Sequence, residues 1–320
     1  VAAQRVSYTW HSVRIGGGGY VSGLVFHPTE KGLYYARTDV GGAYRWDAAA
    51  AHWVPLTDWI GAKDHNLMGI DSLALDPADP DWLYLAAGTY TTPQAGNAAI
   101  LRSHDRGKTF ERFDLSFPLG GNELGRGNGE RLAVDPHDGG ILFLGSRTAG
   151  LWRSADHAAH WAQVGSFPAV ATSLAATATN SWRRQSIGIV FVVFDPASGA
   201  KGRPTPVLYA GVSTRETSLF RSTDGGARWS AVPNQPIGLR PNHMTRGPDG
   251  NYYLTYGDEP GPDQMHDGAV WKFSPSDGHW TDITPIPRHG KPSGFGWGDV
   301  AVDAHDPKIL MASTFCHYTP

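Results

Sequence analysis

Short apolar runs of four to six residues recur along the chain, and Asp, Pro or Gly bounds most of them. Two kinds of run alternate. The first often ends in Asp-Pro, and its copies lie at 23–28, 72–77, 131–136, 192–196 and 300–303. The second follows closely, at 33–36, 83–86, 142–145, 208–211, 252–255 and 310–313. Runs of this length with turn residues at both ends predict β-strands that are buried on both faces.

A third element completes each unit: a strand enters a turn and closes at an aromatic residue. The closing aromatics recur at intervals of 51 to 68 residues, at Trp53, Phe110, Trp161, Trp229 and Trp280. A period of this size with four strands per unit is typical of a β-propeller. We therefore predict one all-β propeller over 1–320. Its units lie at about 23–57, 70–114, 129–165, 188–233 and 244–284, with an incomplete unit from 295, as if truncated within a blade.

Three of the closing turns have the pattern of an Asp-box. Residues 222–229 match it fully, 103–110 match it nearly, and 154–161 keep Asp156 and Trp161 but lack the glycine. In such a turn the Asp accepts backbone N–H groups, Gly supplies an unusual φ, and the aromatic packs beneath. These residues are therefore predicted to be structural.

Superposition of the units indicates one functional candidate. Alignment of the second strands on their first apolar residue places six residues at the same step: Asp39, Thr89, Thr148, Thr214, Asp258 and Cys316. Repeated units carry these loops on one face, opposite the Asp-boxes. Because three units have Thr there, the fold does not require a carboxylate at Asp39. Gly41 and Gly42 would let the backbone approach a ligand; the alternative is an Asp that only caps its turn.

The same face carries the longest insertions, at 90–97 and 258–267. Loops on a rigid scaffold commonly hold function, and aromatic rings stack on sugars. Most of the 12 Trp, 12 Tyr and 12 Phe close turns or lie in strands. The loop aromatics Tyr90, Tyr256 and Tyr318 are the candidates for substrate contact. Asp258 joins them, with a solvated loop acid as the alternative.

Composition removes several function classes. Gly 40 and Pro 23 disfavour long helices. A net charge of −3 gives no basic footprint for nucleic acid, and no apolar run reaches the roughly 20 residues of a membrane span. Cys316 alone cannot form an intrachain disulfide. No phosphate-loop, His-Glu-x-x-His or Cys-x-x-Cys spacing occurs, so no metal or cofactor is expected.

The chain resembles the family 74 glycoside hydrolases, the xyloglucanases, over essentially all 320 residues. The stretches that carry the resemblance are 16–28, 35–46, 66–77 and 127–136. It implies two seven-bladed propellers that face each other across a substrate cleft. We therefore expect a second propeller beyond residue 320, and xyloglucan or a related β-glucan as the partner.

The resemblance implies that Asp39 is the general base of an inverting hydrolysis. Such a reaction uses one carboxylate to activate water and a second, protonated carboxylic acid to donate a proton to the leaving-group oxygen. The family's acid is an Asp of the second propeller, so it is expected outside this chain. The loops that decide between internal and reducing-end cleavage are expected there too. His317, Tyr318 and Thr319 stand where many relatives have paired tryptophans.

Two other functions are left open. A sialidase also uses Asp-boxes, but the segment 13–16 matches its N-terminal motif only in part. A non-catalytic carbohydrate-binding propeller would need no acid at all. A start at Val-Ala-Ala-Gln without Met fits a processed precursor, so we expect a secreted protein, and a monomer.

Overall fold

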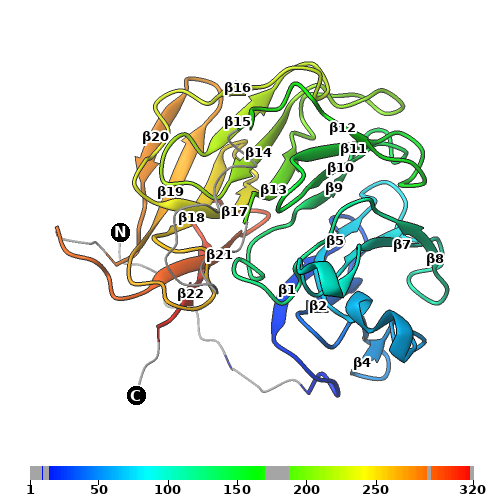
Figure 1. Ribbon diagram of the computed structural model, residues 1–320. Helices are drawn as coiled ribbons and strands as arrows, with labels where there is room; N and C mark the ends of the chain where they lie inside the picture. Colours follow the sequence, from blue (N-terminus) through cyan, green and yellow to red (C-terminus); the bar gives the residue numbers. More distant parts are fainter. Residues whose placement is uncertain (1–8, 10–13, 170–186, 287–289, 318–320) are drawn as a thin grey trace.

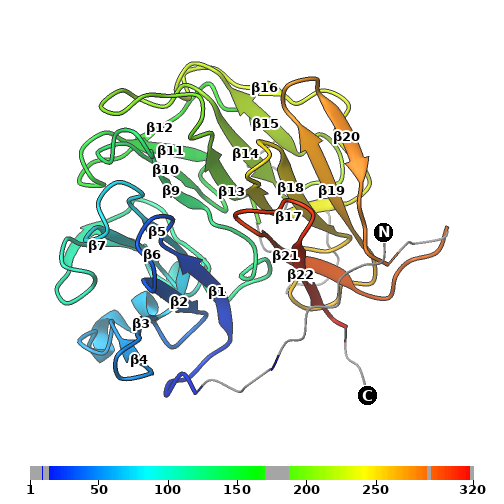
Figure 2. The ribbon, with the colours of Figure 1, turned by 180° about the vertical axis from the view of Figure 1, so that it is seen from behind.

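The computed structural model describes residues 9, 14–169, 187–286 and 290–317. Within these ranges the strands form five antiparallel sheets of four strands and one sheet of two. The sheets stand side by side in chain order around a common axis, as the blades of a propeller (Figures 1 and 2). The prediction of an all-β propeller is therefore confirmed.

Two sheets form the N-terminal part of the disc. The first contains β1 (Val21–Phe26), β2 (Tyr34–Thr38), β3 (Ala43–Asp47) and β4 (His52–Pro55). The second contains β5 (Ile70–Leu75), β6 (Leu83–Ala87), β7 (Ala99–Ser103) and β8 (Glu111–Asp114). Two short 3-10 helices lie in their connections, η1 (Ala62–Met68) before β5 and η2 (Pro93–Ala95) before β7.

The remaining sheets continue in the same order. The third contains β9 (Leu132–Val134), β10 (Leu142–Gly145), β11 (Leu151–Ser154) and β12 (Ala162–Gln163). The fourth contains β13 (Ile189–Phe194), β14 (Leu208–Val212), β15 (Leu219–Ser222) and β16 (Ser230–Ala231). The fifth contains β17 (Arg240–Arg246), β18 (Tyr252–Gly257), β19 (Gly268–Ser274) and β20 (His279–Asp282). The sixth contains β21 (Gly296–Val302) and β22 (Leu310–Phe315).

The Asp-Pro motif explains where the first strand of a sheet ends. Asp76 Oδ1 accepts a hydrogen bond from the backbone N–H of Ala78, and Asp135 Oδ1 accepts one from His137. In the first sheet His27 stands in this place, and its Nδ1 accepts the N–H of Glu30 instead. A side chain that binds its own turn competes with strand pairing, and the following proline has no N–H to donate.

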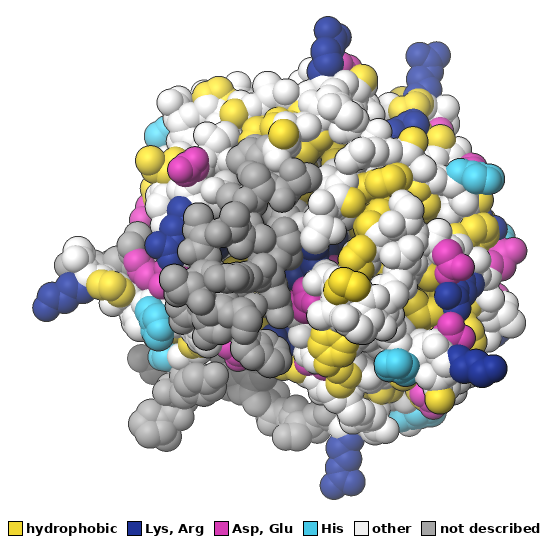
Figure 3. All heavy atoms as spheres, viewed as in Figure 1, with side chains coloured by type: hydrophobic (Ala, Val, Ile, Leu, Met, Phe, Trp, Pro, Cys, Tyr) yellow, Lys and Arg dark blue, Asp and Glu magenta, His cyan; other side chains and the backbone are white. Residues whose placement is uncertain are grey.

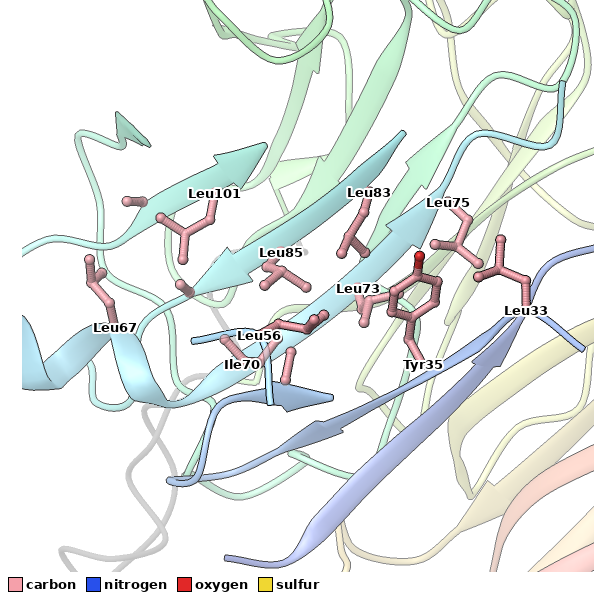
Figure 4. Close-up of a cluster of buried hydrophobic side chains, with 13 residues drawn as sticks. Leu33, Tyr35, Leu56, Leu67, Ile70, Leu73, Leu75, Leu83, Leu85 and Leu101 are labelled. Atoms are coloured by element: carbon pink, nitrogen blue, oxygen red, sulfur yellow. The ribbon is translucent and has the colours of Figure 1, made fainter. Parts of the chain in front are cut away.

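The core lies between neighbouring sheets. Figure 4 shows the cluster between the first and second sheets, where Tyr35 of β2 packs with Leu73 of β5 and Leu85 of β6. None of these three side chains is exposed. Because both faces of an inner sheet are covered in this way, its strands carry continuous apolar runs rather than an alternating pattern.

The Asp-boxes form the local bonds predicted for a structural turn. In residues 222–229, Ser222 Oγ accepts the N–H of Gly226 and donates to Asp224, which in turn accepts the N–H of Arg228. The hydrogen bonds from Arg228 lower the pKa of Asp224 to about 2. The turn at 154–161 keeps the same bonds, with Ala158 at a φ of 67° where the glycine is missing.

Strand pairing corrects the superposition of the units. Tyr34 faces Phe26, as Leu83 faces Leu75. Tyr34, not Leu33, is therefore the equivalent of Leu83, and the first unit was aligned one residue out of register. The true equivalents of Asp39 are Gly88, Arg147, Ser213, Gly257 and Phe315. None is an acid, so the conclusion that the fold does not require a carboxylate there still follows.

One face of the first sheet is exposed. Leu24 and Phe26 are 50% and 62% accessible, whereas Leu73 and Leu75, their equivalents in β5, are buried against the first sheet. On the same face the rings of Phe26, Tyr34, Trp46 and Trp53 form a continuous row of contacts. This apolar face, made of Leu24, Phe26, Tyr34, Trp46 and Trp53, is called the open face below.

Candidate functional site

Asp39 lies in the tight turn that joins β2 to β3. Thr38 Oγ1 accepts the N–H of Gly41 and donates to the carbonyl of Gly42, which fixes the turn. Gly42 has a φ of 84°, and a Cβ there would overlap Thr57 Oγ1. The turn between β2 and β3 lies at one end of the strands. The Asp-boxes join the third and fourth strands of their sheets and so lie at the opposite end. Asp39 is therefore on the face opposite the Asp-boxes.

The two oxygens of the Asp39 carboxylate have different surroundings. Oδ1 accepts a hydrogen bond of 2.8 Å from the backbone N–H of Tyr20. Oδ2 lies 3.5 Å from Nε of Arg126, and only 9% of the side chain is exposed. Gly19, at a φ of 90°, allows this approach because a Cβ would stand 2.7 Å from Oδ1. The carboxylate is thus held in one orientation by the segment before β1.

A buried arginine fixes the loop that carries Arg126. Arg37 of β2 donates from Nε to Glu130 at 2.7 Å, and from its two terminal nitrogens to the carbonyls of Arg126 and Asn128, each at 2.8 Å. Glu130 also accepts from Ser72 Oγ and from the N–H of Leu73. The first sheet, the second sheet and the 126–130 loop are therefore joined at one guanidinium.

A second buried ion cluster supports the same loop from the other side. Asp71 pairs with Arg147 at 2.8 Å and lies 3.5 Å from Arg131, and none of the three side chains is exposed. Burial by itself raises the pKa of Asp71, but the charges of Arg147 and Arg131 outweigh it and lower that pKa. Arg147 also donates to the carbonyl of Leu124.

The segments that carry Asp39 and Tyr90 meet at Gly69. A Cβ on Gly69 would stand 2.6 Å from both the Asp39 carbonyl and Cα of Thr89, so these three segments touch. Tyr90 is 41% exposed, and its hydroxyl accepts a hydrogen bond from Asn122 Nδ2. The structure therefore brings Asp39 and Tyr90 to one face, as the sequence predicts.

The other predicted contact residues are placed differently. Tyr256 is not a loop residue: it lies in β18, is completely buried in the core, and burial raises the pKa of its hydroxyl. Asp258 accepts the N–H groups of His266 and Asp267, so it closes its own loop. Tyr318 lies outside the described residues.

Three residues near Asp39 escape the sequence analysis. Tyr20 supplies the N–H that binds the carboxylate, Arg126 faces its second oxygen, and Asp263 pairs with Arg126 Nη2 at 3.2 Å. The guanidinium of Arg126 also lies 5.4 Å from the centroid of the Tyr20 ring. The only sequence signal is that Arg126 stands in a glycine-rich stretch within 120–129.

Neither a metal cluster nor a membrane-spanning helix is found among the described residues. No group of three His, Cys, Asp or Glu side chains there could hold an ion, and no helix there is long and apolar enough to cross a bilayer. On the face seen in Figure 3, apolar and polar side chains are interspersed, and the described residues form no broad field of Lys and Arg.

Comparison with known proteins decides the family. No protein-family model matches the chain. A curated xyloglucanase from Paenibacillus sp is 48% identical over 322 residues, which cover 100% of this chain and 31% of the relative. The solved structure of a GH74 xyloglucanase from Xanthomonas campestris superposes with a TM-score of 0.90 at 63% identity. The chain belongs to glycoside hydrolase family 74.

The chain matches only part of its family 74 relatives. The match to the Xanthomonas campestris structure covers 98% of this chain and 44% of that one. The Niastella koreensis GH74 enzyme superposes with a TM-score of 0.80 at 39% identity, over 94% of this chain and 41% of that one. The chain thus spans 31% to 44% of the length of these three relatives.

Proposed function

We propose that this chain supplies the general base and one wall of the substrate cleft in a secreted xyloglucan hydrolase. Asp39 is the observation that carries the proposal. One of its oxygens is fixed by a backbone N–H, the other faces a cation, and the carboxylate lies on the face opposite the Asp-boxes. The five equivalent positions in the other sheets hold no acid.

The reaction that fits this geometry is an inverting hydrolysis of the β-1,4-glucan backbone. Asp39 takes a proton from water, whose oxygen attacks the anomeric carbon as the bond to the leaving glucosyl oxygen breaks. A carboxylic acid elsewhere in the protein gives its proton to that oxygen. We place this acid in a second propeller, outside the 320 residues. Tyr90, exposed on the same face, offers a ring for sugar stacking.

The test is the turnover of Asp39→Asn in the protein with both propellers present. Loss of a general base typically costs about 10²- to 10⁴-fold in rate. We expect a loss of this size in the release of reducing sugar from xyloglucan, with little change in oligosaccharide affinity. Wild-type turnover in Asp39→Asn would show that the assignment is wrong.

Asp258→Asn is the matched control. Its carboxylate is occupied by two backbone N–H groups of its own loop, so the variant should keep most of the turnover. Carboxymethylcellulose and a sialoside serve as alternative substrates. Preference for xyloglucan supports the proposed substrate, and cleavage of the sialoside would favour a sialidase.

A non-catalytic binding propeller is the second candidate. The observation that favours it is that both oxygens of Asp39 already face a fixed partner, the N–H of Tyr20 and the guanidinium of Arg126, as those of a structural carboxylate would. Calorimetry of the 320-residue chain with xyloglucan oligosaccharides separates binding from hydrolysis. Binding by the chain alone together with an inactive two-propeller protein would support this candidate.

A further inference from the structure

We propose that Arg126 is a positioning residue for Asp39, whose carboxylate it holds in one orientation while it also pairs with Asp263. This inference rests on the proposed function, since it gives Arg126 a part in the activation of water by Asp39. It comes from the geometry of three neighbouring side chains, those of Asp39, Arg126 and Asp263.

The guanidinium lies between two carboxylates. Its Nε is 3.5 Å from Asp39 Oδ2, and its Nη2 is 3.2 Å from Asp263 Oδ2. Nε is buried and makes no hydrogen bond. At 3.5 Å the contact with Asp39 is an ion pair rather than a well-formed hydrogen bond.

That distance suits a general base. A close, bidentate pair with arginine would occupy the lone pairs that must accept a proton from water. A cation at 3.5 Å keeps the carboxylate in place and leaves Oδ2 free to accept. Tyr20 already occupies Oδ1 through its N–H. Oδ2 is therefore the oxygen that faces water in the proposed reaction.

The backbone around Arg126 leaves it little freedom. Its carbonyl accepts from Arg37, its N–H donates to the carbonyl of Glu123, and the N–H of Gly125 donates to the carbonyl of Gly261. A Cβ on Gly127 would stand 2.6 Å from the ring of Phe315. The side chain packs over the Tyr20 ring and is 17% exposed. The loop is thus built to present one guanidinium to Asp39.

Charged side chains from four segments surround Tyr20, whose N–H binds the Asp39 carboxylate. They are Asp39 itself, Arg37 in β2, Arg126 in its loop and Asp263 in the 258–267 insertion. Arg37 is committed to Glu130 and two carbonyls. Arg126 is therefore the cation whose removal changes the charge next to Asp39.

Three variants of the two-propeller protein test the proposal on xyloglucan. Arg126→Met should lower kcat about 10- to 100-fold with a smaller effect on KM, because the Asp39 carboxylate loses the side chain that faces Oδ2. Arg126→Lys restores a cation there and should recover part of the lost kcat. Asp263→Asn leaves Arg126 to Asp39 alone and should lower kcat less than Arg126→Met does. Wild-type kcat in Arg126→Met, or an equal loss in Arg126→Lys, overturns the proposal.

A second measurement does not depend on catalysis. Thermal unfolding of Asp39→Asn, Arg126→Met and the double variant forms a cycle. If the two side chains interact, Arg126→Met lowers Tm less in the Asp39→Asn background than in the wild type. Equal losses in both backgrounds contradict the contact. Should Asp39→Asn keep full turnover, the proposed function fails, and this cycle alone then decides the role of Arg126.

Discussion

His243 and Asp299 show what one ion pair between the inner strands of two sheets contributes. His243 of β17 lies 2.9 Å from Asp299 of β21, within an axial cavity of about 830 Å³ that Arg37 and Glu130 also line. Burial alone lowers the pKa of His243, but Asp299 outweighs it, so that pKa is raised. Burial raises the pKa of Asp299, and His243 outweighs it in turn, so that pKa is lowered.

The pair should give the protein a pH-dependent stability. A raised histidine pKa stabilises below the unfolded value of about 6.5, and the gain is lost as pH rises through the folded pKa. The lowered pKa of Asp299 gives a gain that is lost as pH falls below about 4. Because Asp299 is 56% exposed, we expect less than about 1 kcal/mol. His243→Gln should therefore lower Tm at pH 5.5 and hardly at pH 8.5.

The control for this prediction is His104→Gln, which breaks an exposed histidine pair with Asp79. Solvent screens that pair, so its pH-dependent loss should be smaller. The same Tm loss for His243→Gln at both pH values would show that the ion pair is not its cause.

At the scale of one element, comparison of two Asp-box turns distinguishes the effect of backbone strain from that of steric overlap. Gly226 has a φ of 87°, and a Cβ there would overlap the ring of Phe143 in the neighbouring sheet. Ala158 occupies the equivalent place in the third sheet at a φ of 67°. The turn itself therefore accepts alanine, and contact with the next sheet decides the outcome.

Gly226→Ala should cost about 2–5 kcal/mol of unfolding free energy, because overlap adds about 1–3 kcal/mol to the strain of a positive φ. Gly202→Ala is the matched control. Its φ is 77° and no atom lies within 4 Å of the added Cβ, so only about 1–2 kcal/mol of strain is expected. Urea unfolding measures both, and equal losses would remove overlap as the cause.

The same scale shows what sequence can and cannot predict. The Asp-boxes follow from the residue pattern because the Ser and Asp hydrogen bonds that define them lie within eight residues. The register of the first unit does not, because Leu33 is apolar and buried in the turn before β2 and so mimics a strand residue. Tyr256 was misplaced because β18 continues to Gly257. Arg126 could not be foreseen, because 87 residues (126−39), including the whole second sheet, separate it from Asp39 in the chain.

At the scale of the whole molecule, the open face is an apolar surface that stands exposed to solvent. Its apolar side chains would be buried in any inner sheet, and they form one connected row. A contiguous apolar area of this kind promotes association or binds apolar probes. Figure 2 shows the first sheet at one end of the row of blades, with β21 and β22 at the other.

Phe26→Ser in the 320-residue chain should reduce the fluorescence of the dye ANS markedly. It should cost less than about 1.5 kcal/mol of stability, because the ring is 62% exposed and loses mainly its stacking on Tyr34. Ile237→Ser removes an isolated apolar residue that is 74% exposed, and should leave dye binding unchanged. Equal fluorescence from wild type and Phe26→Ser would show that the open face does not bind the dye.

The junction at Arg37 also sets an order of assembly. Its partner Glu130 is 93 residues farther along the chain. When the first and second sheets have left the ribosome, Arg37 has Ser22 of its own sheet as an acceptor but still lacks Glu130 and the carbonyls of Arg126 and Asn128. Asp39 lacks Arg126 at that stage. The site around Asp39 therefore matures only when residues 126–130 emerge, 87 residues (126−39) and more after Asp39 itself has been made.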